Sequence, residues 1–244
     1  MIGAHSDSVF AGPGINDDGS GSVGILEVAE QLTAYSTNNS VRICFWSGEE
    51  FGLLGSTYYV SQLTEPEIAN IRLYLNFDMI ASPNYIYAIY DGDGSAFNIS
   101  GPPGSAEAEA FFESFFTDHG LNYTATAFDG RSDYGPFLDV GVASGGLFTG
   151  AEEIKTVEEA DEFGGEAGIA LDVNYHQAGD NFTNLNFDAF EINTKAIAAA
   201  VAEYATSFDS LPPPNSTRVS KRKRSMDSWR GMPKKRGHAS KLSR

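Results

Sequence analysis

The segment Asn76-Phe77-Asp78-Met79-Ile80 places one carboxylate inside an apolar stretch. The residues ahead of it, Arg72-Leu-Tyr-Leu, are expected to form a buried strand, so Asp78 would lie where that strand ends. An ionised carboxylate in apolar surroundings costs free energy unless another group pairs with it. In open α/β sheets, the carboxyl edge of the strands is where ligands bind. The position of Asp78 therefore predicts a ligand site.

Four other segments offer groups that could share this site with Asp78. They contribute His5, Asp17, the pair Glu49-Glu50 and His176. Imidazole nitrogens and carboxylate oxygens are zinc ligands, and two imidazoles with three or more carboxylates match what a pair of zinc ions takes. We therefore expect two Zn²⁺ ions per chain as the cofactor.

Each of these signals also has an ordinary structural explanation. His5 could be a hydrogen-bonded residue at a strand end, and Asn16-Asp17-Asp18-Gly19 could be a turn before a capped helix. Glu49-Glu50 could be a solvated loop pair, and His176 a surface residue. The positions of these residues favour the joint interpretation, because most follow predicted strands and all would lie on one edge of the sheet.

The elements that must position these groups alternate along the chain. Strands are expected up to residue 4 and over 41–47, 72–75, 85–90, 123–128 and 143–148. A first helix is expected to begin at a cap formed by Ser20 or Ser22, and further helices are expected over 56–63, 105–119 and 187–208. Glu65-Pro66 is expected to break the chain after the second helix. The run 41–47 lacks alternation, as in a strand buried on both faces. This order predicts an α/β fold, a three-layer αβα sandwich around a mostly parallel mixed sheet.

Two loops are expected to have functional roles. Residues 130–137 are predicted to form a loop that enters a short helix. Residues 149–174 are long, acidic and irregular, a length that is usual for active-site lids.

The charge divides the chain into two parts. Residues 1–211 hold 32 acidic and five basic residues, a net charge of −27, and are predicted to be the folded domain. Residues 212–244 hold 11 basic residues and one acidic residue, and are predicted to be a disordered tail. An acidic body argues against nucleic-acid binding through the folded domain. The tail has three alternative interpretations: a nuclear-import signal, a nucleic-acid-binding segment or a read-through product.

The sequence also carries signals about location. No apolar run approaches the roughly 18 residues of a membrane span, so no membrane association is expected. N-x-S/T sequons begin at Asn38, Asn98, Asn122, Asn181 and Asn215, which favours a secreted or vacuolar glycoprotein. No signal peptide precedes His5, and the start is therefore expected to be truncated.

The motifs occur in the order seen in one enzyme family. Over residues 1–208 the chain resembles the co-catalytic zinc aminopeptidases, which include aminopeptidase Y and the secreted bacterial and fungal leucine aminopeptidases. The resemblance rests on six motifs: His5-Ser-Asp7, Gly14-Ile-Asn-Asp17-Asp-Gly-Ser-Gly21, Ser47-Gly-Glu49-Glu50-Phe-Gly-Leu-Leu-Gly-Ser56, Asn76-Phe-Asp78-Met, Gly130-Arg-Ser-Asp-Tyr-Gly-Pro-Phe137 and Tyr175-His176. It implies a zinc-exopeptidase-like fold.

The resemblance also implies a role for each matching metal ligand. Asp17 would bridge both zinc ions. His5 and Asp78 would complete one zinc site, and Glu50 and His176 the other.

Three further residues would act on these ligands or on the reaction. Asp7 would orient the imidazole of His5, and Tyr175 would stabilise the oxyanion. Glu49 would be the general base, a choice between the two glutamates that residue types alone leave open.

The substrates implied are peptides with a free N-terminus, and Arg131 would help to bind them. Phe128, Tyr134 and Phe163, with Phe137 nearby, could line a pocket for the substrate side chain or could be ordinary core. The sequence predicts no oligomeric state.

Four alternatives remain beside aminopeptidase activity. A glutaminyl cyclase on the same scaffold would use one zinc ion. A carboxypeptidase would need cationic groups for the substrate carboxylate, and the domain offers only five. A non-catalytic receptor domain would be expected to lose ligands, and all five are present. An inactive truncated fragment is also possible, because missing first elements would expose a sheet edge and apolar surface.

Overall fold

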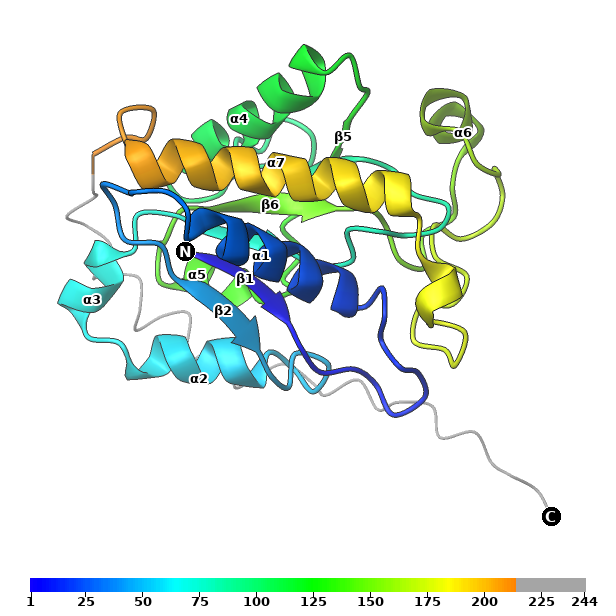
Figure 1. The fold of residues 1–244 in the computed structure, drawn as a ribbon, viewed down its shortest axis with the longest axis horizontal. Helices are drawn as coiled ribbons and strands as arrows, with labels where there is room; N and C mark the ends of the chain where they lie inside the picture. Colours follow the sequence, from blue (N-terminus) through cyan, green and yellow to red (C-terminus); the bar gives the residue numbers. More distant parts are fainter. Residues whose placement is uncertain (214–244) are drawn as a thin grey trace.

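The computed structural model of the chain describes residues 1–213, which form one mixed sheet with helices on both faces (Figure 1). The predicted tail lies, from residue 214 on, outside the described residues. Six strands are found in the described part, in the spatial order β2-β1-β3-β6-β4-β5. Their bounds are β1 Ile2–His5, β2 Ile43–Trp46, β3 Tyr74–Phe77, β4 Ala88–Tyr90, β5 Thr124–Thr126 and β6 Ser144–Phe148.

The strand directions bring the predicted ligands to one edge. Strand β1 pairs in parallel with both β2 and β3, and β3 pairs in parallel with β6. Strand β4 runs antiparallel to β6, and β5 is parallel to β4. His5 is in register with Trp46, so the carboxyl ends of β1 and β2 lie side by side. The mostly parallel mixed sheet is confirmed.

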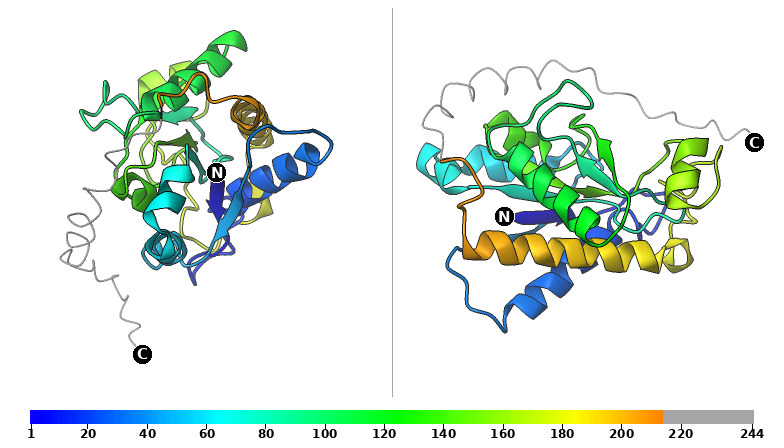
Figure 2. Two further views of the ribbon diagram at one scale, coloured as in Figure 1. Left: turned by 90° about the vertical axis from the view of Figure 1, so that its left-hand side faces the viewer. Right: turned by 90° about the horizontal axis from the view of Figure 1, so that it is seen from above.

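The helices form the two outer layers of the predicted sandwich. Helices α1, α4 and α7 cover one face of the sheet, and α2, α3 and α5 cover the other (Figure 2). The bounds are α1 Gly19–Leu32, α2 Leu54–Gln62, α3 Glu65–Asn70, α4 Ser105–Asp118, α5 Gly135–Asp139, α6 Val157–Phe163 and α7 Phe187–Thr206. Leu75 and Phe77 of β3 pack into the core on the side of α1, α4 and α7, and Tyr74, which directly precedes Leu75 and so points to the opposite face, packs into the core on the other side.

Several elements differ from their predictions at the ends. Strands β4 and β5 each have three residues, fewer than predicted. Helix α3 begins where only a break was expected, because Thr64 and Glu67 form a capping box and proline is well tolerated in a first helical turn. Residues 149–174, which were predicted to be irregular, contain α6, and a second capping box from Thr156 and Glu159 starts this helix.

Strand β2 was predicted to be buried on both faces, and this was wrong. The side chain of Phe45 is 45% exposed, because β2 is the last strand at its end of the described sheet. A cavity of about 640 Å³ lies nearby, at the amino ends of β1 and β3, and is lined in part by Ile2, Leu73 and Phe208. It contains none of the predicted ligands.

The start of α1 differs from its prediction. The cap is the side chain of Asp18, which accepts a hydrogen bond from the Gly21 N–H, and neither Ser20 nor Ser22 fills this role. None of the described helices combines the length and the apolar character that a membrane crossing requires.

Candidate metal centre

The five predicted ligands converge at the carboxyl edge of the sheet. His5 is the last residue of β1, and Asp78 directly follows β3. Glu50 lies in the loop after β2, Asp17 in the loop before α1, and His176 in the loop before α7. Because parallel strands end at the same edge, residues far apart in the sequence meet here.

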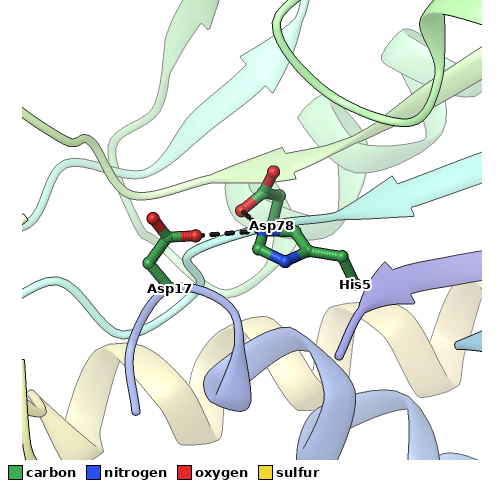
Figure 3. A group of neighbouring side chains, drawn as sticks. All are labelled: His5, Asp17 and Asp78. Atoms are coloured by element: carbon green, nitrogen blue, oxygen red, sulfur yellow. Dashed lines mark ion pairs between the residues drawn. The ribbon is translucent and has the colours of Figure 1, made fainter. Parts of the chain in front are cut away.

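Asp17 lies between the two imidazoles. Its Oδ1 is 3.0 Å from His5 Nε2, and its Oδ2 is 3.1 Å from His176 Nε2. His5 Nε2 is also 3.5 Å from Asp78 Oδ1. Figure 3 shows the side chains of His5, Asp17 and Asp78 pointing toward one another. His176 Nε2 is 2.9 Å from Glu50 Oε2. Two groups of three ligands therefore share Asp17, and within each group the ligand atoms lie within 4.8 Å of one another.

The ring of His5 presents the correct nitrogen for a metal ion. Its Nδ1 lies 3.0 Å from the backbone carbonyl of Asp7. A carbonyl can only accept, so Nδ1 carries a hydrogen, and Nε2 is the ring nitrogen that faces the carboxylates and becomes free to bind a metal ion when it loses its proton. The Asp7 carboxylate, which was expected to orient this ring, is 3.8 Å away. It accepts instead from the N–H groups of Glu49 and Glu50, at 3.1 and 3.3 Å.

Carboxylates outnumber cations in this centre, and the pKa values reflect this. Burial lowers the pKa of His5, but the carboxylates of Asp78 and Asp17 raise it well above its usual value. The pKa of His176 rises to about 10 through Asp17 and Glu50, despite an opposing effect of burial. Burial raises the pKa of Asp17, but the two imidazoles outweigh this and hold it at about 2.

Glu49 belongs to neither group of three ligands. Its Oε2 lies 4.0 Å from His5 Nε2 and faces the same cavity as the ligands. Burial and the nearby Asp78 raise the pKa of Glu49 to about 9. An unliganded carboxylate beside a metal centre is suited to moving protons.

The donor set fits zinc. One buried oxygen, Glu50 Oε1, has no hydrogen-bond partner among the described residues. An orphaned buried polar atom is costly, and a cation in contact with this oxygen would remove that cost. Two nitrogens and the oxygens of three carboxylates are the ligand types that zinc takes.

A series of buried hydrogen bonds, not predicted from the sequence, ends on Asp78. Trp46 Nε1 donates to Tyr74 Oη at 2.8 Å, and Tyr74 Oη donates to Asn76 Oδ1 at 2.9 Å. Asn76 Nδ2 then donates to Ser132 Oγ at 2.8 Å, and Ser132 Oγ donates to Asp78 Oδ2 at 2.6 Å. The other oxygen of Asp78 is left to face His5. The sequence signals for this series were the two motifs that contain Asn76 and Ser132.

Tyr175 and Arg131 lie beside the ligands. The ring of Tyr175 stacks on His176 with centroids 3.8 Å apart. Arg131 Nη2 is 3.4 Å from the Tyr175 hydroxyl and 2.8 Å from Glu152 Oε1. Burial, followed by the charge of Asp17, raises the pKa of Tyr175, so its hydroxyl stays protonated and can donate.

The predicted side-chain pocket is only partly as expected. A cavity of about 70 Å³ adjoins the ligands, and Arg131 and Tyr134 line it. Phe128 does not line this cavity but stacks behind it on Tyr90, with centroids 5.1 Å apart. Apolar surface comes instead from residues the sequence did not single out: Tyr90, Phe148 and Ala151.

Two predicted pocket residues belong to the core. Phe163 ends α6 and packs against Tyr87, because the helix turns this ring toward the sheet. Phe137 stacks on Tyr74 with centroids 4.0 Å apart. For these two residues the ordinary core explanation fits the structure, and neither lines the cavity.

Comparison with known proteins identifies similar sequences. The model of peptidase family M28 matches residues 1–201. The chain is 62% identical over 221 residues to the probable leucine aminopeptidase 2 of Aspergillus fumigatus, covering 91% of this chain and 44% of that protein. It is 59% identical over 212 residues to leucine aminopeptidase 2 of Trichophyton rubrum, covering 87% of this chain and 43% of that protein. The chain thus spans less than half the length of these relatives.

Similar folds occur among solved structures. The zinc aminopeptidase BSAP from Bacillus subtilis superposes with a TM-score of 0.67 at 24% identity, covering 87% of this chain and 47% of that one. The aminopeptidase from Aneurinibacillus sp. strain AM-1 gives a TM-score of 0.67 at 23% identity, covering 84% and 43%. These two comparisons establish a shared fold.

Proposed function

Since the chain belongs to peptidase family M28, we propose that residues 1–211 are the catalytic domain of a two-zinc aminopeptidase. The observation that carries this proposal is Asp17, whose two carboxylate oxygens each face a different imidazole. The names of the relatives support the aminopeptidase activity.

Each zinc ion would have its own ligands and share Asp17. His5 and Asp78 would hold one ion, and Glu50 and His176 would hold the other. Two bound ions would lower the pKa of a water molecule between them and polarise the scissile carbonyl. The remaining steps belong to side chains of the protein.

Glu49 is the general base in this proposal. It takes a proton from the water that attacks the scissile carbonyl carbon, and then passes that proton to the leaving amine. Glu49 must be ionised to do so, and cations held by the two groups of ligands would lower its pKa from about 9. Tyr175 donates its hydroxyl hydrogen to the oxygen that becomes negative in the tetrahedral intermediate.

The substrates are peptides with a free N-terminus. A protonated α-amine is attracted by the surplus of carboxylates at the metal centre, so the first residue of a peptide is the one that enters. Arg131, which lines the cavity, is placed to contact the substrate backbone, and Tyr134 contributes to the wall of the side-chain pocket. The cavity of about 70 Å³ next to the ligands would take the side chain of that first residue.

The geometry favours this function over the two related reactions. A glutaminyl cyclase would need one zinc ion, whereas two groups of ligands share Asp17. A carboxypeptidase would need a free cationic group, but Arg131, the one Lys or Arg lining the cavity among the described residues, already pairs with Glu152. We also propose a secreted or vacuolar location, on the basis of the sequons.

The base can be tested by Glu49→Gln. This variant should keep both zinc ions but lose about 10²–10⁴-fold in kcat for aminoacyl-anilide hydrolysis, since only the proton-transfer group is removed. Glu203→Gln, an exposed change on α7, is the control and should keep full activity. A Glu49→Gln variant as active as the parent would refute the proposed mechanism.

A further inference from the structure

The segment that carries Tyr175 and His176 has a buried aspartate at each end. Asp172 is 1% exposed and Asp180 is 2% exposed. Within residues 1–213, neither carboxylate has an ion pair with a Lys, Arg or His side chain among the recorded contacts. Two buried carboxylates without a cation are expensive unless N–H donors surround them.

The donors to these carboxylates come from the loop of the bridging ligand. Asp180 Oδ1 accepts from the Asn16 N–H at 2.8 Å, and Asp180 Oδ2 accepts from the Asp17 N–H at 3.1 Å. Asp172 Oδ2 accepts from Asn16 Nδ2 at 2.7 Å. Both ends of the segment with His176 are therefore fastened to the residues that present Asp17.

Asn184 joins the two carboxylates. Its Nδ2 lies 2.9 Å from each oxygen of Asp172 and 3.3 Å from Asp180 Oδ1. Its Oδ1 accepts from Asn174 Nδ2 at 2.6 Å. In the described part of the chain, the Asn184 amide is the one side chain that hydrogen bonds to both aspartates. Such a shared donor fixes their separation, and truncating it leaves buried acceptors with fewer partners.

We propose that Asn184 is a positioning residue for the metal centre. It sets the register between the loop that carries His176 and the loop that carries Asp17, and so sets the distance between these two ligands before a metal ion binds. This inference rests on the proposed two-zinc site and adds a residue that touches neither ligand. Its role is to hold the His176 imidazole where the second ion needs it.

The test compares zinc binding by full-length Asn184→Ala, Asn184→Asp and Asn193→Ala proteins. Asn193 is the matched control, because it is also fully buried and its Nδ2 donates to the Ile80 carbonyl at 3.1 Å. Dissociation constants for both zinc ions come from competition with a chelator, and the stability of the metal-free proteins comes from thermal unfolding. Activity is not needed as a readout.

Asn184→Ala should raise the dissociation constant of one of the two zinc ions about 10–100-fold. Asn184→Asp should raise this dissociation constant at least as much, because the substitution places a third carboxylate beside those of Asp172 and Asp180. Asn193→Ala should lower the unfolding temperature but leave both dissociation constants within about threefold. In a His176→Ala background, adding Asn184→Ala should not change the affinity of the remaining ion.

The outcomes separate the two proposals. If the parent binds two zinc ions and Asn184→Ala binds both with parental affinity, the positioning role is wrong. The positioning role is also wrong if Asn193→Ala lowers the affinity for zinc as much as Asn184→Ala does. If the parent itself does not bind two zinc ions, the proposed function fails, and the role of Asn184 fails with it.

Discussion

At the scale of single residues, the centre holds more negative charge than its two imidazoles can balance. Asp17, Glu50 and Asp78 all lie within ion-pair distance of a histidine nitrogen. The field of these carboxylates keeps protons on the imidazoles, and cations would compete for the same positions. Metal binding and proton release should therefore be linked.

We expect zinc binding at pH 7 to release about three protons per chain, one from each imidazole and one from Glu49, whose pKa of about 9 the bound cations would lower. The pKa of His5 is well above its usual value and that of His176 is about 10, so both rings are protonated at pH 7 and must lose a proton to bind zinc. Zinc affinity should accordingly rise as pH rises. Calorimetry in buffers of different ionisation enthalpy measures the released protons. Release of less than one proton would show that the imidazoles do not both become ligands.

Asp133 should make stability depend on pH. Burial raises its pKa from 3.8 to about 7. Ser56 Oγ donates to Oδ1, whereas Oδ2 has no hydrogen-bond partner among the described residues. Between these two pH values the folded metal-free protein holds a proton that the unfolded chain releases, so the free energy of unfolding falls as pH rises.

The variant Asp133→Asn stays neutral and should lack this dependence. As pH rises from 3.8 to about 7, the free energy of unfolding of the variant minus that of the parent should increase by about 1.4 kcal/mol for each pH unit. Urea unfolding of both metal-free proteins at pH 5 and pH 7 provides the measurement. Parallel pH profiles for the two proteins would contradict the assignment.

The ligands could be predicted from the sequence because their residue types reveal their chemistry. His5 and Asp78 stand out as polar residues at the ends of apolar strands, and Asp17 stands out in a loop that opens a helix. Ser132 and Asn184 could not be found in this way, since serine and asparagine are common in loops and their role depends on a distant partner. For Phe163, residue type suggested a pocket, but the packing of α6 decided its place.

At the scale of elements, Asp18 fastens three segments together. Its carboxylate oxygens accept hydrogen bonds from the backbone N–H groups of His5, Gly21 and Met79, each with an N···O distance of 3.0 Å. These donors belong to the end of β1, the first turn of α1 and the turn after β3. One buried side chain thus positions two of the strand ends that carry ligands.

Asp18→Ala should therefore cost more than loss of an ordinary helix cap. We expect the free energy of unfolding to drop by about 2–4 kcal/mol, because two buried N–H groups lose their partner in addition to the cap. Asn186→Ala at α7 is the matched control, since Asn186 accepts only the Ala189 N–H at 3.0 Å as a cap, and should cost about 1 kcal/mol. Equal losses in urea unfolding of the metal-free variants would contradict the fastening role.

Element order was easier to predict than element length. The alternation of strands and helices was sufficient for the sandwich, because apolar runs and turn signals mark each element. The short strands β4 and β5 and the helices α3 and α6 were missed or misjudged in length. In each case local capping or tertiary pairing decides the boundary, as with Thr156 and Glu159 at α6.

At the scale of the whole molecule, the loop 91–101 carries a candidate site for N-glycosylation. Asn98 begins a sequon and is exposed, and neither it nor Ser100 makes a recorded side-chain hydrogen bond within residues 1–213. Phe97 and Ile99 beside it are 43% and 52% exposed. A glycan on Asn98 would cover this apolar surface without disturbing an existing contact.

Secretion of the chain from yeast should therefore give a protein glycosylated at Asn98. Enzymatic deglycosylation in ¹⁸O water followed by mass spectrometry identifies the modified asparagines. Asn122 is the comparison, because its Nδ2 already donates to the Glu162 carbonyl at 3.1 Å. An unmodified Asn98 next to a modified Asn122 would overturn this prediction.

The central claim is that Asp17 bridges two metal ions, and anomalous diffraction at the zinc edge tests it most directly. We predict two zinc peaks roughly 3.5–4 Å apart. One should lie beside His5 and Asp78, the other beside Glu50 and His176, with an oxygen of Asp17 bound to each. A single peak, or two peaks of which one lacks Asp17 as a ligand, would contradict the account.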